Sequence, residues 1–347
     1  MNETSKRKDD HIRIALHEDV AFEQLTTHFE HYRFTHQALP ELDLEQVDTR
    51  TTFLGKSLTF PLLIASMTGG SATGTQLNRR LAEAAQAAGV GLALGSLRAA
   101  LEDPATAASF QLRRYAPDIL LLANLGAVQL NYGYGLDACR RAVELTEADA
   151  LILHLNPLQE ALQPEGQTRF AGLLPKIAAL CRALPVPVIA KEVGWGLSLA
   201  VGHQLVEAGV AALDVAGAGG TSWSQVELHR SPTAQQREIA AAFREWGIPT
   251  AEALRALRLA LPATPLIASG GLVTGVELAK ALALGAELTS LARPLLHAAS
   301  DSVEALLQQL EILRRQLQIT MFAAGAGDIA ALRQTPLVYD GPGQPKE

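Results

Sequence analysis

The feature that most constrains the fold is a regular alternation of short apolar runs with amphipathic helical patterns. Eight runs of aliphatic and β-branched residues occupy positions 62–65, 90–94, 119–123, 150–153, 186–190, 211–215, 266–268 and 287–291. A helical pattern, such as 76–88 or 275–284, separates each run from the next. Strands that alternate with helices pair in parallel, because each helix returns the chain to the same end of the sheet.

Eight such units over about 230 residues predict an α/β fold, a (β/α)8 TIM barrel, in a single domain. We expect residues 61–300 to form this barrel. Residues 1–60 would be an N-terminal extension whose hairpin closes the barrel bottom, and residues 301–347 a C-terminal helix and tail. The alternative is a doubly wound open sheet, but Met67-Thr68-Gly69-Gly70-Ser71 lacks the GxGxxG spacing that usually follows its first strand.

The composition excludes several classes of protein. Of the 347 residues 48% are hydrophobic, which is typical of a globular protein with a large core. The net charge is −7, so a general nucleic-acid binder is not expected. No apolar run reaches the ~18 residues of a membrane helix, and the charged start has no signal-peptide core. Cys139 and Cys181 lack CxxC spacing, as expected of reduced thiols. We therefore expect a soluble, cytoplasmic protein without nucleic-acid or membrane partners, and the many apolar helices suggest a homo-oligomer, tetrameric or octameric.

Polar or glycine residues follow every predicted strand. These segments are 67–70, 95–98, 124–126, 154–160, 191–194, 217–221, 269–271 and 292–294. In a (β/α)8 barrel the active site is built from the carboxyl ends of the strands. We therefore expect one site that gathers side chains from all eight ends.

The segment His154-Leu155-Asn156-Pro157-Leu158-Gln159-Glu160 brings an imidazole, two carboxamides and a carboxylate to one strand end. Pro157 stops the strand there, because proline cannot donate to a ladder. No second carboxylate or histidine stands at the spacing of a zinc site. Glu160 alone suits Mg²⁺ that is held mainly by substrate phosphates and water. A structural core histidine is the alternative for His154.

Glycines at the late strand ends predict an anion site. Gly217, Gly219, Gly220, Gly270 and Gly271 would let backbone N–H groups approach a phosphate, and the helix that begins near Gly275 adds its dipole. A tight turn without a ligand is the alternative.

Lys191 ends a strand whose preceding residues belong inside the barrel. Such a lysine forms a Schiff base, pairs with an anion or hydrogen-bonds an electron-rich ring, unless it is a surface residue. Glu192 would face the other way and is expected to be a salt-bridge partner.

Two further segments could approach this end of the barrel. The opening Lys6-Arg7-Lys8-Asp9-Asp10-His11 is either a solvated tail or a cationic segment that folds over a diphosphate, and Arg98 could meet the same anion. The long connection 219–249 is expected to be a lid or binding loop.

Several motifs, in this order, resemble the type 2 isopentenyl-diphosphate isomerases. They are RKDDHI, SMTGG, GSLR, ANLG, HLNPLQE, KEVGWGLS, AGAGGTSW and EWGIPTA, from about residue 7 to residue 295. The resemblance implies a flavoenzyme that interconverts isopentenyl and dimethylallyl diphosphate using reduced FMN, Mg²⁺ and NAD(P)H. NAD(P)H would only prime the flavin, because the isomerisation involves no net redox change.

The resemblance also implies residue roles. It assigns the isoprenoid diphosphate to Arg7, Lys8, His11, Ser96, Arg98 and Gln159, catalysis to His154, Asn156 and Gln159, and Mg²⁺ to Glu160. It assigns FMN to Ser66, Met67, Thr68, Ser96, Asn124, Lys191 and Thr221, and its phosphate to the backbone of Gly271, Leu291 and Ala292. The chain departs from the family at Asp10, Ala216 and Val273, where Glu, Ser and Arg are common.

Two rival functions stay open. Another FMN-dependent barrel oxidoreductase, of the 2-hydroxy-acid oxidase or dihydroorotate dehydrogenase type, would need a histidine base and an arginine clamp late in the barrel. Here His229, Arg230 and His297 are the candidates. A barrel that binds flavin or phosphate without catalysis would lack turnover altogether.

Overall fold

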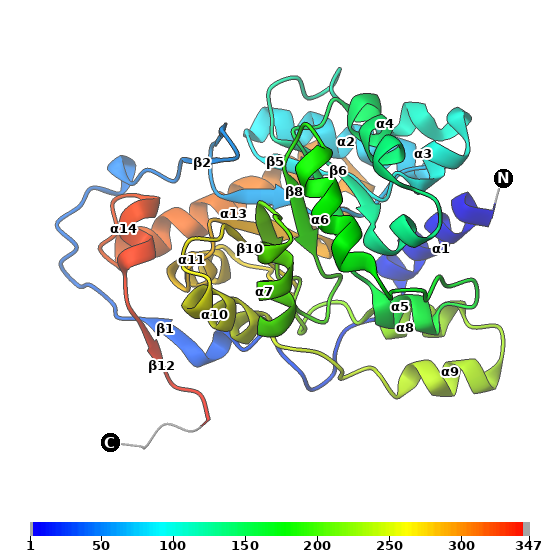
Figure 1. Cartoon of the computed structure of the whole chain (residues 1–347). Helices are drawn as coiled ribbons and strands as arrows, with labels where there is room; N and C mark the ends of the chain where they lie inside the picture. The colour runs from blue at the N-terminus through cyan, green and yellow to red at the C-terminus, as the bar shows by residue number, and fades with distance from the viewer. Residues whose placement is uncertain (1–2, 343–347) are drawn as a thin grey trace.

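Eight parallel strands close into a barrel in the computed structural model, which describes residues 3–342 (Figure 1). Their order around the barrel is β4-β5-β6-β7-β8-β9-β10-β11, so each strand pairs with its neighbours in the sequence. The strands are β4 (Leu62–Ile64), β5 (Gly91–Ala93), β6 (Leu121–Gly126), β7 (Ala150–His154), β8 (Val188–Lys191), β9 (Ala212–Asp214), β10 (Leu266–Ser269) and β11 (Leu288–Leu291). All eight predicted strands are confirmed, and the open-sheet alternative is wrong.

Helices surround this barrel and connect its strands. They are α2 (Ala72–Ala88), α3 (Arg98–Glu102), α4 (Leu136–Thr146), α5 (Pro157–Leu162), α6 (Leu173–Ala183), α7 (Leu199–Glu207), α10 (Thr250–Ala260), α11 (Gly275–Ala283) and α12 (Arg293–Asp301). Short 3₁₀ helices η3 (Pro104–Phe110) and η4 (Ala127–Asn131) complete the second and third connections. In Figure 1, α6, α7 and α10 lie in front of the strands.

The strands are buried on both faces, so their residues alternate between two apolar layers. One layer fills the barrel interior and includes Leu63, Leu122, Ile152 and Ile267. The other faces the helices and contains, among others, Leu62, Leu121 and Leu151. This double burial explains why the strands appear in the sequence as continuous apolar runs.

The predicted hairpin is present, as β2 (Thr51–Phe53) antiparallel to β3 (Lys56–Leu58). Phe53 and Leu58 join the interior layer of the barrel. Because this layer also contains Leu120, Ala150 and Leu288 from strand beginnings, the hairpin closes the amino-terminal end of the barrel. The opposite end is therefore the one available for a site.

The two ends of the chain meet in a pairing that the sequence analysis did not predict. β1 (Tyr32–Phe34) runs antiparallel to β12 (Leu337–Tyr339), beyond α13 (Val303–Ala323) and α14 (Ile329–Gln334). The α13 helix packs against α2, α11 and α12. The division into three segments at residues 60 and 300 stays a prediction, and residues 343–347 of the expected tail lie outside the described part.

The connection 219–249, which was expected to be a lid or binding loop, contains two helices. It contains α8 (Trp223–Arg230) and α9 (Ala234–Ala241). The α8 helix packs against α5 and against α1 (Glu3–His17), which begins the described chain. This connection therefore lies over the carboxyl ends of the strands, as a lid would.

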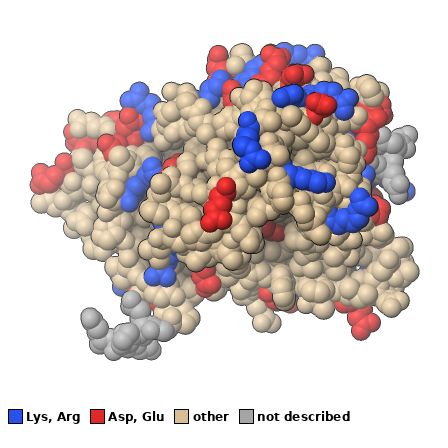
Figure 2. Space-filling model, in the orientation of Figure 1, with Lys and Arg blue, Asp and Glu red and all other residues tan. Residues whose placement is uncertain are grey.

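Charged residues of both signs are interspersed on the face that Figure 2 shows. Among residues 3–342, no helix is both long and apolar enough to cross a lipid bilayer.

Candidate active site

One cavity of about 630 Å³ lies at the carboxyl ends of the barrel strands. All the residues to which the resemblance assigned a role line it. They are Arg7, Lys8, His11, Ser66, Met67, Thr68, Ser96, Arg98, Asn124, His154, Asn156, Gln159, Glu160, Lys191, Thr221, Gly271, Leu291 and Ala292. The geometry thus gathers the predicted set, while the role of each residue stays a prediction.

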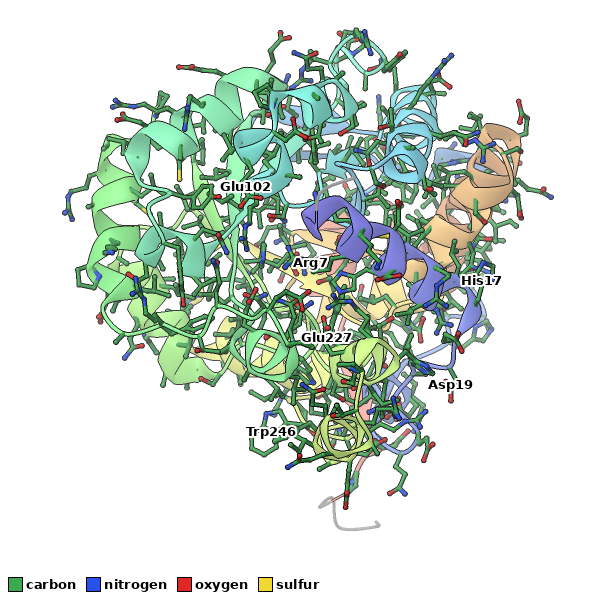
Figure 3. The ribbon with its side chains drawn as sticks, turned by 90° about the vertical axis from the view of Figure 1, so that its right-hand side faces the viewer. Arg7, His17, Asp19, Glu102, Glu227 and Trp246 are labelled. Carbon is green, nitrogen blue, oxygen red and sulfur yellow. The ribbon has the colours of Figure 1, made fainter. Side chains whose placement is uncertain are left out.

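The α1 helix covers part of this cavity, so the alternative of a solvated tail is wrong for the described residues 6–11. Ile12 and Ile14 are buried and anchor the helix on the barrel. In Figure 3, Arg7 lies near the middle of the view, on the half of α1 that crosses the barrel opening, and Glu227 lies below it.

Lys8 is the most buried cation of α1. Its Nζ donates to the carbonyl of Ser96 at 2.7 Å and lies 4.8 Å from the centre of the Phe110 ring. Burial, together with the charge of Arg7, lowers the pKa of Lys8 to about 7. The pKa of Arg7 is also lowered, by burial first and then by Arg98. Two cations held this close favour binding of a negatively charged ligand between them.

Arg98 lies at the same end of the cavity but is engaged by protein groups. Its Nε donates to Glu102 at 2.7 Å, and the hydroxyl of Tyr134 donates to the same carboxylate oxygen. A ligand phosphate would have to share this guanidinium with Glu102 or displace it.

His154, at the end of β7, is held as a neutral imidazole. Burial first, and then the charges of Lys191, Arg7 and Lys8, lower the pKa of His154 to about 3. Its Nδ1 lies 2.7 Å from Oδ1 of Asn124. Since an amide oxygen only accepts, we assign the proton to Nδ1, which leaves Nε2 as an acceptor.

Gln159 and Asn156 form a connected amide pair beside it. Asn156 Nδ2 donates to Oε1 of Gln159 and to Oε1 of Glu160, both at 3.1 Å. The Oε2 atom of Glu160 accepts the backbone N–H of Gln167 at 2.6 Å and the amide of Gln163 at 3.3 Å. Asn156 Oδ1 is buried and has no hydrogen-bond partner among the described residues.

Glu227, on α8, is a functional candidate that the sequence analysis missed. Its side chain has no exposed surface, and its Oε1 accepts from Gln159 Nε2 at 3.0 Å and contacts His11 Nε2 at 3.1 Å. Burial alone would raise the pKa of Glu227, but His11, Arg230 and Gln159 lower it to about 2. The carboxylate is therefore ionised at neutral pH.

A signal for Glu227 was present in the sequence. Trp223, Val226, Glu227 and Arg230 stand at helical spacing. Trp223 and Val226 line the cavity, and Glu227 stands directly beside Val226 on the buried part of the helix. This spacing is informative only in a helix, and the sequence analysis expects a lid or binding loop over 219–249.

Lys191, at the end of β8, lies inside the barrel mouth beside a second buried acid. Its Nζ is 3.7 Å from Oδ2 of Asp214 on β9 and donates to the carbonyl of Glu192 at 2.7 Å. Of the arrangements expected for this lysine, pairing with an anion is the one that the structure shows.

The expected salt bridge of Glu192 is wrong. Its Oε2 accepts three backbone N–H groups, those of Val193, Gly194 and Trp195, at 2.6–2.7 Å. Glu192 therefore caps the turn after β8 and plays no direct part in the cavity.

The late glycines form a tightly packed pair of turns at the other end of the cavity. A Cβ at Gly220 would lie 2.5 Å from the backbone N of Gly271, and one at Gly270 would lie 2.1 Å from the carbonyl O of Gly217. Gly270 and Gly271 both have positive φ, 102° and 78°. Only glycine allows two backbones this close together with this geometry.

The cavity contains no ready-made metal cage. Within residues 3–342, no group of three or more His, Cys, Asp or Glu side chains is placed to hold a metal ion. Any divalent cation here would need oxygen ligands from a bound phosphate or from water.

Comparison with known proteins identifies the family. The model of the FMN-dependent dehydrogenase family matches residues 2–118 and 158–339. An isopentenyl-diphosphate delta-isomerase of Nostoc sp. is 52% identical over 333 residues, which cover 96% of this chain and 95% of the relative. The chain belongs to the FMN-dependent isopentenyl-diphosphate delta-isomerase family.

A second isomerase agrees with this assignment, and two solved structures share the fold. The isopentenyl-diphosphate delta-isomerase of Stutzerimonas stutzeri is 55% identical over 96% of both chains. A lactate oxidase of Pediococcus acidilactici has a TM-score of 0.67 at 17% identity, covering 96% of this chain and 93% of its own. A mandelate oxidase has a TM-score of 0.64 at 19% identity, covering 95% and 92%. These two solved structures share the fold.

The cavity fits the FMN that the family name implies. Ser66 Oγ and Ser290 Oγ are buried polar atoms without a partner among the described residues, and both residues line the cavity. The glycine turns, with Leu291 and Ala292, offer backbone N–H groups to a phosphate. At two of the departures from the family, Ala216 and Val273, the side chain is apolar and supplies no polar contact to a cofactor. Ala216 has a φ of 37°, and Val273 is half exposed.

Proposed function

We propose that this protein interconverts isopentenyl diphosphate and dimethylallyl diphosphate with reduced FMN. The observation that carries the proposal is a cavity with a cationic α1 at one end and a glycine cradle at the other. The amide of Gln159 lies in its lining and is held by the buried carboxylate of Glu227. The cationic end suits the diphosphate, and the cradle suits the cofactor phosphate. The roles of FMN contacts, substrate contacts and catalytic residues given above belong to this proposal.

The reaction adds a proton at one carbon of the alkene and removes a proton from another, so no electrons are gained or lost overall. Reduced FMN, when bound, supplies an electron-rich ring that exchanges a proton and stabilises positive charge. The residues of this chain orient the substrate and exclude water. Gln159 donates to Glu227 and accepts from Asn156, so its amide presents one remaining N–H and one lone pair to a neighbouring group.

Mg²⁺ and NAD(P)H complete the proposal. Glu160 would contribute one carboxylate to a cation held mainly by the diphosphate and water, because the described residues form no cage by themselves. NAD(P)H would reduce the flavin before turnover. A cytoplasmic location and a tetrameric or octameric assembly stay predictions.

The neutral His154 disfavours the rival oxidation of 2-hydroxy acids. A base that accepts a proton from a hydroxyl group works best with a pKa near the working pH, whereas burial lowers the pKa of His154 to about 3. Arg293 lines the cavity, but its guanidinium donates to the carbonyls of Ala15 and Glu18 in and after α1. Of the three residues that the sequence analysis named for this rival, His229 and Arg230 do not line the cavity, whereas His297 does. Burial first, and then the charge of Arg293, lower the pKa of His297.

The test is anaerobic turnover of isopentenyl diphosphate with FMN, Mg²⁺ and NADPH, each omitted in turn. Dimethylallyl diphosphate that forms only with reduced flavin and Mg²⁺, without stoichiometric loss of NADPH, supports the proposal. NADPH consumed one-for-one without the isomer would overturn it. Replacing Gln159 or Glu160 should lower turnover and leave FMN bound, whereas Lys191→Ala should release FMN.

A further inference from the structure

Glu227 is held from two sides, and the partners on one side, Gln159 and His11, line the cavity. Its Oε1 contacts Gln159 and His11, whereas its Oε2 accepts from Arg230 Nη1 at 2.7 Å. Arg230 lies one helical turn further along α8 and its side chain is 11% exposed. It does not line the cavity, and its hydrogen bond to this carboxylate connects it to Gln159.

Arg230 is itself fixed by a second acid. Its Nη2 donates to Oε1 of Glu165, which lies in the segment after α5. The guanidinium therefore bridges the lid helix and the segment that follows Gln159 and Glu160. A planar guanidinium with two carboxylate partners has little freedom to rotate.

The protonation state of Glu227 decides which way the amide of Gln159 points. An ionised carboxylate only accepts, so Gln159 must present Nε2 to it and Oε1 to Asn156, as observed. A protonated Glu227 could donate, and the amide could then reverse. Because an arginine stays charged throughout the working pH range, it keeps the carboxylate ionised where a histidine would not.

We propose that Arg230 is a positioning residue, which holds Glu227 as the anion and thereby fixes the orientation of the Gln159 amide for reaction. This inference rests on the proposed isomerisation, because it assigns Gln159 to the reacting end of the substrate. Arg230 lies outside the lining of the cavity in which substrate and cofactor are proposed to bind.

Other charges surround Glu227. His11 faces it from α1, whereas Arg7 of the same helix interacts with Arg230, Glu160 and Glu165. Glu160 lies on α5 and Glu165 on the segment after it. The α9 helix packs on α8 but carries its charges, Arg237 and Glu238, on the exposed side. Loss of Arg230 would thus leave a buried carboxylate with His11 as its titratable partner.

The experiment compares Arg230→Gln, Arg230→Lys and Arg237→Gln as FMN-loaded enzymes. Arg237→Gln is the matched control, since it removes the same charge from the same lid without a contact to Glu227. We expect Arg230→Gln to lower kcat by about 10²-fold, the order associated with a small misplacement of a reacting group, with a smaller change in KM. The acid limb of its kcat–pH profile should move upward. Arg230→Lys should restore most of kcat, and Arg237→Gln should match the wild type.

A double variant separates positioning from general structural damage. If Arg230 acts through Glu227, then Glu227→Gln combined with Arg230→Gln should have the same kcat as Glu227→Gln alone, because the loss is shared. The assignment would be overturned if the double variant lost kcat by the product of the two single losses. It would also be overturned if the acid limb of the Arg230→Gln kcat–pH profile did not move. FMN content of each variant shows that it is folded.

The pH dependence of unfolding distinguishes failure of this inference from failure of the proposed function. If wild-type protein forms no dimethylallyl diphosphate, the isomerase proposal fails. The proposed effect of Arg230 on kcat then fails too. The electrostatic coupling between Arg230 and Glu227 is still tested by measuring the stability of the FMN-free proteins as a function of pH. Arg230→Gln should lose stability at higher pH than the wild type as the solution is acidified, and identical pH dependence would refute the coupling.

Discussion

Lys191 Nζ lies 3.7 Å from Oδ2 of Asp214, between neighbouring strands of the barrel. The Asp214 side chain is only 1% exposed, and its Oδ1 accepts from the Ser269 hydroxyl at 2.5 Å and from the N–H of Ala216 at 3.3 Å. The carboxylate is thus fixed from β10 while its charge faces the lysine. This pair places a compensated cation at the mouth of the barrel, where the flavin ring is proposed to lie.

Replacing Asp214 with Asn should therefore destabilise the protein and weaken FMN binding. A buried ammonium without its counter-charge costs roughly 3 kcal/mol, which should appear in urea unfolding of the FMN-free protein. Asp137→Asn, at an exposed position of α4, is the matched control and should leave the curve unchanged. Adding Lys191→Met to Asp214→Asn should recover part of the loss, and a stable single variant would contradict the pairing.

A second prediction concerns the glycine cradle. A methyl group at Gly220 would meet the backbone N and Cα of Gly271 at 2.5 and 2.6 Å, and two backbone segments cannot move aside as a flexible side chain can. Gly220→Ala should separate the turns and cost at least one hydrogen bond to the cofactor phosphate, which corresponds to roughly 10–100-fold in FMN affinity.

Gly135→Ala is the control for that variant, because a Cβ there meets no atom within 4 Å. Fluorescence titration of FMN into the FMN-free proteins gives both affinities. Equal affinities for the two variants would place the cofactor phosphate elsewhere.

The barrel could be predicted because each of its strands is buried on both faces. Runs such as Leu62–Ile64 and residues 188–190 are then continuously apolar, and the helices between such runs keep a clear amphipathic pattern. The cavity lining could be predicted for a related reason: the carboxyl ends of all eight strands converge in a closed barrel.

The missing features depend on partners that are remote in sequence. Asp214 sits inside an apolar run, and its meaning appears only when β8 places Lys191 beside it. Glu227 is 68 residues from Gln159 and 216 from His11. The β1–β12 pairing joins residues about 300 positions apart, and local patterns contain no record of such a partner.

The pKa of Lys8 predicts that binding of a diphosphate takes up a proton. Burial lowers this pKa to about 7, so above pH 7 much of Lys8 is neutral until an anion restores its charge. Affinity for the diphosphate should then fall by up to about tenfold per pH unit above 7. Calorimetry in two buffers with different ionisation heats would measure the proton uptake at pH 8.

Lys8→Arg tests the origin of that proton, since a guanidinium stays charged at pH 8. The variant should show less proton uptake and a flatter pH dependence. Lys176→Arg, on α6 and outside the cavity lining, should behave as the wild type. Undiminished uptake in Lys8→Arg would assign the proton to another group.

The neutral state of His154 gives a prediction for both spectroscopy and stability. Its pKa is lowered to about 3, first by burial, so ¹⁵N spectra should show a neutral imidazole protonated on Nδ1 from pH 8 down to pH 5. In the unfolded chain an imidazole takes up a proton below about pH 6.5. His154 alone should therefore reduce the free energy of unfolding by about 1.4 kcal/mol for each pH unit between 6.5 and 3.

His154→Asn identifies the signal and removes this contribution, because an amide does not titrate. The difference in unfolding free energy between wild type and variant should then change by that slope as the pH falls from 6.5 to 5, whereas it should be constant above pH 7.5. A cationic His154 at pH 6, or a difference that does not vary with pH, would return the imidazole to the list of possible proton donors. The predicted neutral state instead leaves the titration of the site to Glu227 and the cations of α1.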